Sequence, residues 1–293
     1  MKMDNDFAKL QRETRKRNRK QAMGIFFGRG IIVKLCTVVV VGFIFMAVFA
    51  DWITPYDPAA QNLVEKLQTP SASHWLGTDF LGRDVLSRVI YGGRVSMYVS
   101  LLSGSFAAVI GIGLGLVAGY VTGIVRRVIM GMTDIILSIP GMVFTLIIAA
   151  IMGTGVMSLT LAIGITYIRM VNGLVLSLKE NDYIVASKLV GRSESKILLK
   201  HLLPNAFPSL IVLYTINLGN AIMTESSLSY LGVGINPPTA TWGNMVSDAY
   251  AYLLQAPWLA MIPGICIIIL IISFNVVGDG LRDALDPRLR GKL

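Results

Sequence analysis

Residues Asp182–Asn205, DYIVASKLVGRSESKILLKHLLPN, form the longest polar interval in the second half of this chain. Long apolar runs lie on both sides of the interval, so it is expected to join two membrane spans. Apolar residues at helical spacing predict two short helices, with Gly191 as the turn between them because glycine accepts a positive φ. Leu203-Pro204 is expected to stop the second helix. Two short helices held between spans could dock on a partner, and a solvated connecting loop is the alternative.

The composition predicts a membrane protein. The chain has 293 residues, of which 54% are hydrophobic and 15% are charged. This balance excludes an ordinary soluble domain and favours an all-α, polytopic membrane protein. The net charge of +9 does not indicate nucleic acid, because the basic residues lie beside apolar runs. Cys36 and Cys266 lie inside such runs, and His74 and His201 lie far apart, so no disulfide, metal site or other cofactor is expected.

Six apolar runs reach the length of about 20 residues that a spanning helix needs. If six spans alternate, the loops rich in Lys and Arg fall on one side, which predicts that both termini and the 174–206 loop are cytoplasmic. The expected organisation is a basic arm (1–30), a first span (31–51), an extracytoplasmic segment (52–95), a core of five spans (96–282) and a cytoplasmic tail (283–293). The core spans are expected at 96–120, 127–150, 154–173, 207–231 and 257–278.

The predicted extracytoplasmic segment ends in a short amphipathic pattern. Val85, Val89 and Ile90 form its apolar face, which predicts a helix that lies along the outer membrane interface. Contact of its charged face with a receptor is an equally compatible interpretation. Trp242 and Trp258 are expected in the same interfacial belt.

Small residues and proline shape two of the predicted spans. Gly111, Gly115 and Gly119 recur at intervals of four, which predicts a smooth strip where another helix packs closely. Pro140 lies inside the predicted third span and is expected to kink it, because it removes a helix hydrogen bond.

A polar stripe runs along the predicted fifth span at steps of three and four residues. Such a stripe is costly in lipid, so it is expected to face protein or water. Hydrogen bonding between helices and a wet substrate path are both compatible with it. Its members are Tyr214, Asn217, Asn220, Thr224 and Ser227.

Charged residues also lie inside the predicted spans, and three of them stand out. Glu225, near the outer end of the fifth span, could contact a substrate or hold the outer loop in place, and the second interpretation is favoured. Asp134 and Arg169 are expected to form a structural ion pair, which reduces the cost of charge inside the membrane.

The first motif resembles the "EAA" loop of binding-protein-dependent ABC-importer permeases. The family pattern is Glu-Ala-Ala, three residues, Gly, nine residues and Ile-x-Leu-Pro; Val185 stands here in place of the glutamate and His201 in place of the isoleucine. The resemblance implies that this loop docks on an ATPase subunit. The residues expected to form the docking loop are Val185, Ala186, Ser187, Gly191, Arg192, Leu203 and Pro204.

Four further stretches resemble the dipeptide, oligopeptide and nickel class of these permeases, in the right order over about 200 residues. They are HWLGTDFLGRDVLSRVIYGGRVS (74–96), LSIPGMVF (137–144), ESSLSYLGVGINPPTATWG (225–243) and FNVVGDGLRDALDPRLR (274–290).

The resemblance implies a type I permease fold with six spans in a bacterial plasma membrane. The implied partners are a sister permease, two ATPase subunits and an extracytoplasmic substrate-binding protein. This chain is similar to the second permease of such systems, and peptide is the favoured substrate. Nickel or a metal chelate is the alternative, although the 14 methionines are dispersed along the chain.

The residues themselves also bear on functions of other classes. The sequence holds no phosphate-binding loop of the form GxxxxGK[ST], so a non-catalytic transport subunit whose partners bind ATP is expected. A self-contained channel or secondary transporter would be supported by an inverted repeat or a coupling-ion site, and neither is visible. An intramembrane enzyme would need paired catalytic groups at membrane depth, and Asp134 has no carboxylate partner in the apolar runs.

Overall fold

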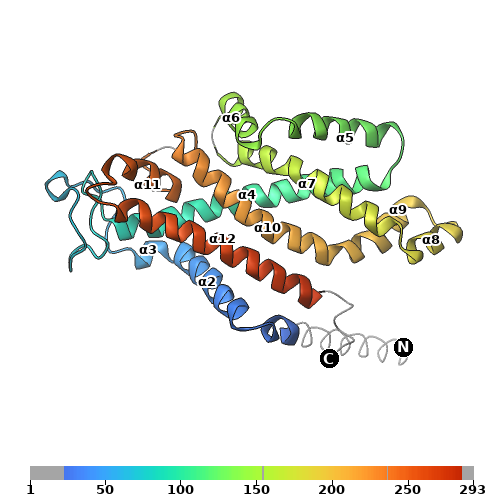
Figure 1. Cartoon of the computed structure of the whole chain (residues 1–293), viewed down its shortest axis with the longest axis horizontal. Coiled ribbons are helices and arrows are strands. Elements are labelled where there is room, and N and C mark those ends of the chain that lie inside the picture. The colour runs from blue at the N-terminus through green and yellow to red at the C-terminus, as the bar shows by residue number, and fades with distance from the viewer. Residues whose placement is uncertain (1–22, 154, 236, 286–293) are drawn as a thin grey trace, which may run out of the picture.

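The computed structural model describes residues 23–153, 155–235 and 237–285 of the chain. These residues form an elongated bundle of long helices (Figure 1). Among them no strand forms, so the predicted all-α class is correct. The longer helices are α2 (Ile31–Val48), α4 (Val85–Tyr120), α7 (Val156–Lys179), α10 (Leu203–Tyr230) and α12 (Trp258–Leu285). The shorter ones are α3 (Ala50–Ile53), η1 (Leu63–Glu65), α5 (Ile124–Leu137), α6 (Gly141–Met152), α8 (Asp182–Leu189), α9 (Glu194–Ile197), η2 (Leu198–Leu202), α11 (Trp242–Ala249) and η3 (Tyr250–Tyr252).

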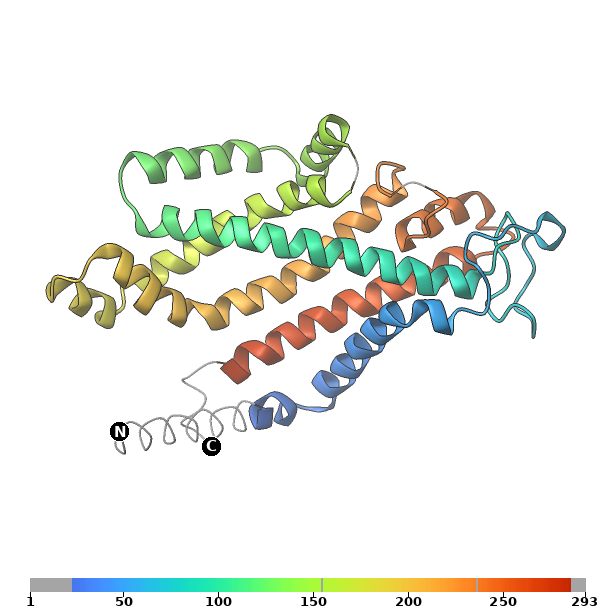
Figure 2. The same ribbon diagram turned by 180° about the vertical axis from the view of Figure 1, so that it is seen from behind.

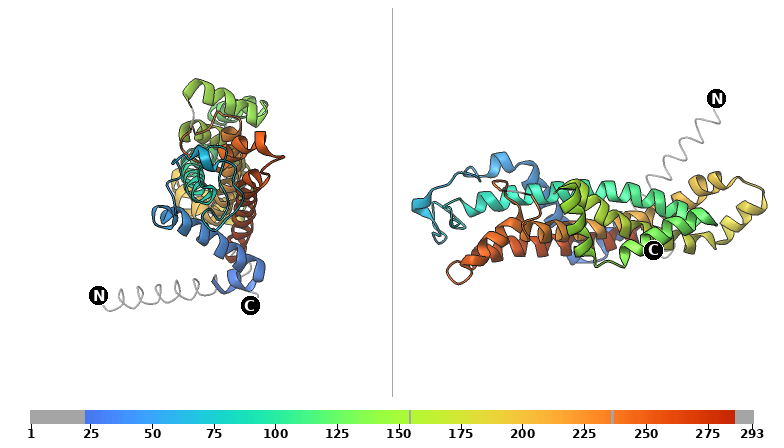
Figure 3. Two further views of the ribbon diagram at one scale, coloured as in Figure 1. Left: turned by 90° about the vertical axis from the view of Figure 1, so that its left-hand side faces the viewer. Right: turned by 90° about the horizontal axis from the view of Figure 1, so that it is seen from above.

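The two ends of the bundle are different. At one end, here named the α8 end, α8 and α9 project beyond the long helices (Figures 1 and 2). At the opposite end, the α11 end, α11 and the loops between α3 and α4 close the bundle, and the view from above shows the same arrangement (Figure 3). Most of the predicted basic arm (1–22 of 1–30) and of the predicted tail (286–293 of 283–293) lies outside the described residues.

Five helices are long and apolar enough to cross a membrane, with α10 counted together with the helical residues before it. The predicted third span, 127–150, is not a straight helix. It consists of α5 and α6, which meet at 99°, and the number of spans reaches six only if this bent pair crosses as one. Pro140 is the residue that precedes α6, and its ring and missing N–H prevent the helix of α5 from continuing. The predicted kink is therefore a break between two helices.

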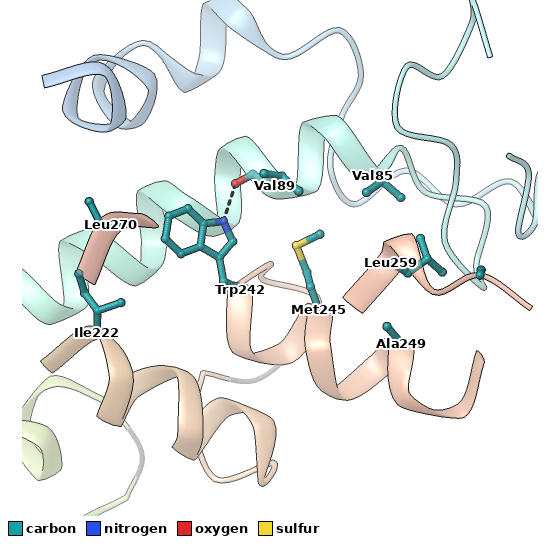
Figure 4. Packing of buried hydrophobic residues seen from close by; sticks show 9 residues of the cluster. Val85, Val89, Ile222, Trp242, Met245, Ala249, Leu259 and Leu270 are labelled. Atoms are coloured by element: carbon teal, nitrogen blue, oxygen red, sulfur yellow. Dashed lines mark hydrogen bonds between the residues drawn. The ribbon is translucent and has the colours of Figure 1, made fainter. Parts of the chain in front are cut away.

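The amphipathic segment before the second span is not a separate interfacial helix, which corrects the prediction. It forms the start of α4, a single helix of 36 residues that begins after Asp84, whose side chain accepts a hydrogen bond from the Ser87 N–H at 2.8 Å. Val85, Val89 and Ile90 are buried. Val85 and Val89 pack with residues of α11 and α12 in one hydrophobic cluster (Figure 4). This apolar face is covered by the protein itself, so it does not lie on the membrane surface.

Trp242 lies at the centre of the same cluster and is fully buried, so the expected interfacial position for this residue is wrong. Its indole N–H donates to the Val89 carbonyl oxygen at 2.9 Å (Figure 4). Gly92 and Gly93 make room for the ring, because a Cβ at Gly93 would lie 2.7 Å from Trp242 Cζ2. The pair of glycines thus fixes α11 against α4.

The glycine strip on α4 packs against α7, as predicted. A Cβ added at Gly115 would lie 2.6 Å from Val171 Cβ, and one at Gly119 would lie 2.5 Å from Val175 Cβ. Real Cβ atoms essentially never come so close to other heavy atoms, so the two helix backbones approach to a distance that only glycine permits.

The predicted helix stop at Leu203-Pro204 is wrong. A π-helical turn, η2, carries the chain from α9 directly into α10, and Pro204 lies in the first turn of α10. Proline is tolerated there because the N–H groups of a first helical turn have no partner within the helix.

Candidate functional site

A groove of about 360 Å³, here named the polar groove, lies between α6, α7 and α10, and polar side chains interrupt its otherwise apolar lining. Four members of the predicted stripe line it, namely Asn217, Asn220, Thr224 and Ser227. Thr145 of α6 and Thr166 of α7 form its other polar walls. The groove therefore brings hydroxyl and amide groups from three helices to one hollow.

The groove side chains differ in how far their polar atoms are already occupied. Asn217 is 1% exposed and donates to the Leu213 carbonyl oxygen at 2.7 Å. Thr224 donates to the Asn220 carbonyl oxygen, and Ser227 donates to the Met223 carbonyl oxygen, both at 2.8 Å. Asn220 is exposed to the groove. The two hydroxyl groups thus present acceptor oxygens, while Asn220 can both donate and accept.

Tyr214 and Glu225 do not line this groove. Tyr214 shares a hydrogen bond of 2.8 Å with Ser105 of α4, and Glu225 is 1% exposed and accepts from Ser229 at 2.8 Å. With about 100° per residue in an α-helix, the two lie within about 20° of each other and about 120° or more from Asn220. They belong to the face of α10 that packs inside the chain, so the geometry does not support a substrate path at Tyr214 or the less favoured substrate contact at Glu225.

A second hollow of about 340 Å³ continues from the groove toward the α11 end. Its lining is mostly apolar and includes Tyr230, Leu231 and Val246. Met142 and Met223 line both hollows. Methionine is flexible and polarizable and adapts to neighbours of different shape. Met142, Met223, Thr145 and Thr166 were not among the residues predicted from the sequence, because single residues of these types in apolar runs carry no periodic signal.

At the α8 end, the chain forms the predicted pair of short helices. Gly191 has φ +74° and links α8 to α9, which are anchored by three fully buried side chains, Ile184, Ile197 and Leu202. These three pack in one cluster with Leu116 and Tyr120 at the end of α4 and with residues of α7 and α10. Any force on α8 and α9 would thus pass directly to the long helices.

The outer surface of this helix pair carries an apolar patch on α8 beside the charged residues Lys188, Arg192, Glu194 and Lys196. Val185, Leu189 and Val190 are 47%, 84% and 79% exposed. Ala186 and Pro204 are also exposed, while Leu203 is half-buried against the anchoring cluster. Val185, Leu189 and Val190 lie within two turns, on α8 and the residue that follows it, and apolar side chains so exposed indicate a contact surface for another protein.

Two polar contacts hold the shape of the helix pair. The Ser187 hydroxyl donates to the Tyr183 carbonyl oxygen at 2.7 Å. Arg192 Nη1 donates to His201 Nε2 at 2.7 Å, which ties the start of the second helix to η2. The histidine that stands in place of the family's isoleucine therefore has a partner within the loop.

Asp134 and Arg169 form the predicted ion pair, with 2.9 Å between Oδ1 and Nη1. The pair links α5 to α7. Both side chains remain more than half exposed, at 54% and 59%.

Two of the basic residues before the second span, Arg83 and Arg88, are not free for a receptor. Arg83 and Arg88 are 4% and 3% exposed. They bind Asp79 at 2.6 and 3.4 Å, and both also approach Asp248 of α11, at 3.4 and 3.8 Å. This buried cluster joins the loop before α4 to α11, and loss of one partner would leave a costly unpaired charge.

Comparison with known proteins identifies relatives over nearly the whole chain. Residues 111–291 match the family described as "Binding-protein-dependent transport system inner membrane component". Residues 34–70 match the N-terminal TM domain of oligopeptide transport permease C.

Comparison with individual proteins also finds transport system permeases. The dipeptide transport system permease protein of Alkalihalophilus pseudofirmus is 37% identical over 257 residues, which cover 86% of this chain and 84% of the relative. The oligopeptide transport system permease protein of Bacillus subtilis is 38% identical, with the same coverage. The glutathione transport system permease protein of Pectobacterium atrosepticum is 38% identical over 250 residues, 84% of this chain and 83% of the relative. A chain of the MetNI methionine ABC transporter in an inward-facing conformation shares the fold, with a TM-score of 0.59 and 23% identity over 69% of this chain and 97% of that one.

Proposed function

We propose that this chain, which belongs to the family of binding-protein-dependent transport system inner membrane components, forms one half of the transmembrane path of an ATP-driven peptide importer. The chain is a multi-pass membrane permease subunit with a type I permease fold. Its closely similar relatives are named for dipeptides, oligopeptides and glutathione, which are all peptides.

The polar groove is the observation that carries the proposal for the path. Thr166 and Asn220 on its wall are exposed in the single chain, and polar side chains of this kind are costly against lipid. A sister permease that packs over α5, α6, α7 and α10 would enclose the groove as a wet path. Hydroxyl and amide groups suit a peptide, because every peptide bond brings one donor and one acceptor.

The α8–α9 pair serves as the ATPase-docking surface in this proposal. In the bacterial plasma membrane the α8 end and both termini face the cytoplasm, as the Lys and Arg distribution favours. Two ATPase subunits bind below the two permeases, and an extracytoplasmic substrate-binding protein delivers the peptide at the α11 end. When ATP draws the ATPases together, the anchored helix pair moves with them and tilts the long helices, which switches access to the groove.

Reconstitution tests the function. The chain is produced with its sister permease and both ATPases, purified as a complex and placed in liposomes with the loaded binding protein. We expect ATP-dependent uptake of labelled peptide and no uptake of nickel. Uptake of nickel alone would show a metal importer of the same class, and peptide uptake by this chain without ATPases would show a self-contained transporter.

A substitution in the docking surface tests the role of the α8–α9 pair. Val185→Asp buries an unpaired charge if this surface meets an ATPase, at a cost of several kcal/mol. We expect the complex to hydrolyse ATP without uptake or to lose the ATPases in purification. The same change at Leu254, which is fully exposed at the α11 end, is the control and should leave ATPase binding intact. Normal uptake by the Val185→Asp complex would refute the docking role.

A further inference from the structure

The Asp134–Arg169 ion pair lies in the predicted third and fourth spans, with Arg169 near the middle of α7 and Asp134 in the last turn of α5. Arg169 is ten residues before Lys179, the last residue of α7, and Asp134 is ten residues after Ile124, the first residue of α5. At 1.5 Å per residue, both lie about 15 Å inside the α8 end of their helices. In the predicted spans 127–150 and 154–173, Asp134 lies seven residues and Arg169 four residues from the cytoplasmic end, so both are inside the hydrocarbon core.

Charges at this depth are normally hidden inside the protein. This pair is more than half exposed on the surface of the single chain. Lipid is an unfavourable neighbour for either charge, and a pair held only to join α5 to α7 would be expected on the buried side of those helices. The pair therefore faces a second chain or water.

The exposed face of α7 connects the pair to the polar groove. Thr166 lines the groove, and Arg169, Gly173 and Ser177 follow it at steps of three, four and four residues, all exposed. A Cβ at Gly173 would meet no atom within 4 Å, so this part of the face is open. The face thus continues the wall of the groove from its centre toward the α8 end.

Residues of α5 and α10 also connect the ion pair to the groove. On α5, Asp134 and the exposed Ser138 are one turn apart, and Gly141 and Met142, just beyond the break at Pro140, line the groove. On the α10 side, Asn217 donates to the sulfur of Met170, the exposed neighbour of Arg169, at 3.7 Å. The charged pair and the polar groove therefore belong to one surface.

We infer that Asp134 and Arg169 form a subsite on the path that binds the charged termini of a peptide, which rests on the proposed function. The Arg169 guanidinium matches the planar α-carboxylate of a peptide, and the Asp134 carboxylate accepts hydrogen bonds from its α-ammonium group. In the absence of a peptide, the two side chains neutralise each other. When a zwitterionic peptide binds, the Asp134–Arg169 ion pair is replaced by two new ion pairs, one at each end of the peptide. The peptide itself is neutral, so no net charge is added at this depth.

The test compares two peptides in the reconstituted complex. One is a labelled tripeptide with a free carboxylate, and the other is the same tripeptide with a C-terminal amide. Both are presented on saturated binding protein, with loading measured separately, so that the preference of the binding protein does not enter. The variants are Arg169→Gln, Arg169→Lys and Asp134→Asn. Arg29→Gln breaks the Arg29–Asp283 ion pair of 2.7 Å, which lies off the groove, and serves as the control.

We expect Arg169→Gln to slow uptake of the free acid by about tenfold or more, as for the loss of one charge-assisted hydrogen bond, and to leave the amide unchanged. Arg169→Lys keeps the charge and should keep most of the preference for the free acid. Asp134→Asn should act in the same way on a pair of peptides with a free or an acetylated N-terminus. Arg29→Gln should alter neither ratio.

Other results would overturn the inference. An unchanged ratio of acid to amide uptake in Arg169→Gln excludes recognition of the carboxylate. A lower yield of complex with normal uptake of both peptides per complex shows that the pair is only structural. In both cases the wild-type complex still imports peptide, so the proposed function stands. Absence of ATP-dependent uptake of either peptide by the wild-type complex overturns both proposals.

Discussion

Because α4 and α7 approach closely at Gly115, adding a single methyl group there is expected to destabilise the protein. Gly115→Ala adds a Cβ that would lie 2.6 Å from Val171 Cβ and 2.9 Å from the Ile168 carbonyl oxygen. Carbon atoms in contact normally lie about 3.5–4.0 Å apart. One of the two obstacles is backbone, so the helices have to separate or shift along each other by roughly 1 Å.

The same substitution two residues earlier isolates this effect. Gly113 lies on the exposed side of α4, and a Cβ there meets nothing within 4 Å. Both variants gain the same helix propensity, so the difference between them is the cost of overpacking, about 1–3 kcal/mol. This corresponds to roughly a 5- to 150-fold difference in the unfolding equilibrium.

The assay is equilibrium unfolding of the purified complex in mixed micelles with an increasing fraction of denaturing detergent. We expect Gly113→Ala to unfold at or above the wild-type midpoint and Gly115→Ala to unfold clearly below it. Uptake per assembled complex should fall for Gly115→Ala alone, because α7 carries one wall of the groove. Equal midpoints for the two variants would refute the reasoning that backbone contact at this glycine holds α4 to α7.

Three further predictions concern the groove, the helix pair and the topology. Asn220→Leu should impair peptide uptake although the complex still assembles. Tyr214→Phe should leave uptake intact and cost only about 1 kcal/mol of stability. Normal uptake by Asn220→Leu with impaired uptake by Tyr214→Phe would place the path on the other face of α10. Gly191→Val should strain the turn at φ +74° by about 1–2 kcal/mol and weaken coupling of ATP hydrolysis to uptake, and full coupling would contradict the role of the turn. A cysteine introduced at Ser193 should resist an impermeant thiol reagent in intact cells and one at Thr239 should react, and the opposite pattern would invert the orientation.

Several features of the protein could be determined from the sequence alone because they depend on local properties. The apolar runs had to be membrane helices, since their length matches the bilayer. The turn at Gly191 followed from a glycine between two amphipathic segments, and the close packing at Gly115 followed from the spacing of small residues. The break at Pro140 was indicated by the chemistry of proline, although its angle was not.

The tertiary structure decided which faces meet. The same apolar side chains suit lipid and protein interior equally, so hydropathy could not show that Trp242 and Val89 are buried or that α4 runs on from Val85 without a break. The polar stripe on α10 was visible, but only the packing of α6 and α7 separates Asn220, which faces the groove, from Tyr214, which faces α4. Neighbouring helices set these contacts through their rotation and crossing, and the periodicity of one helix contains no information about the helix beside it.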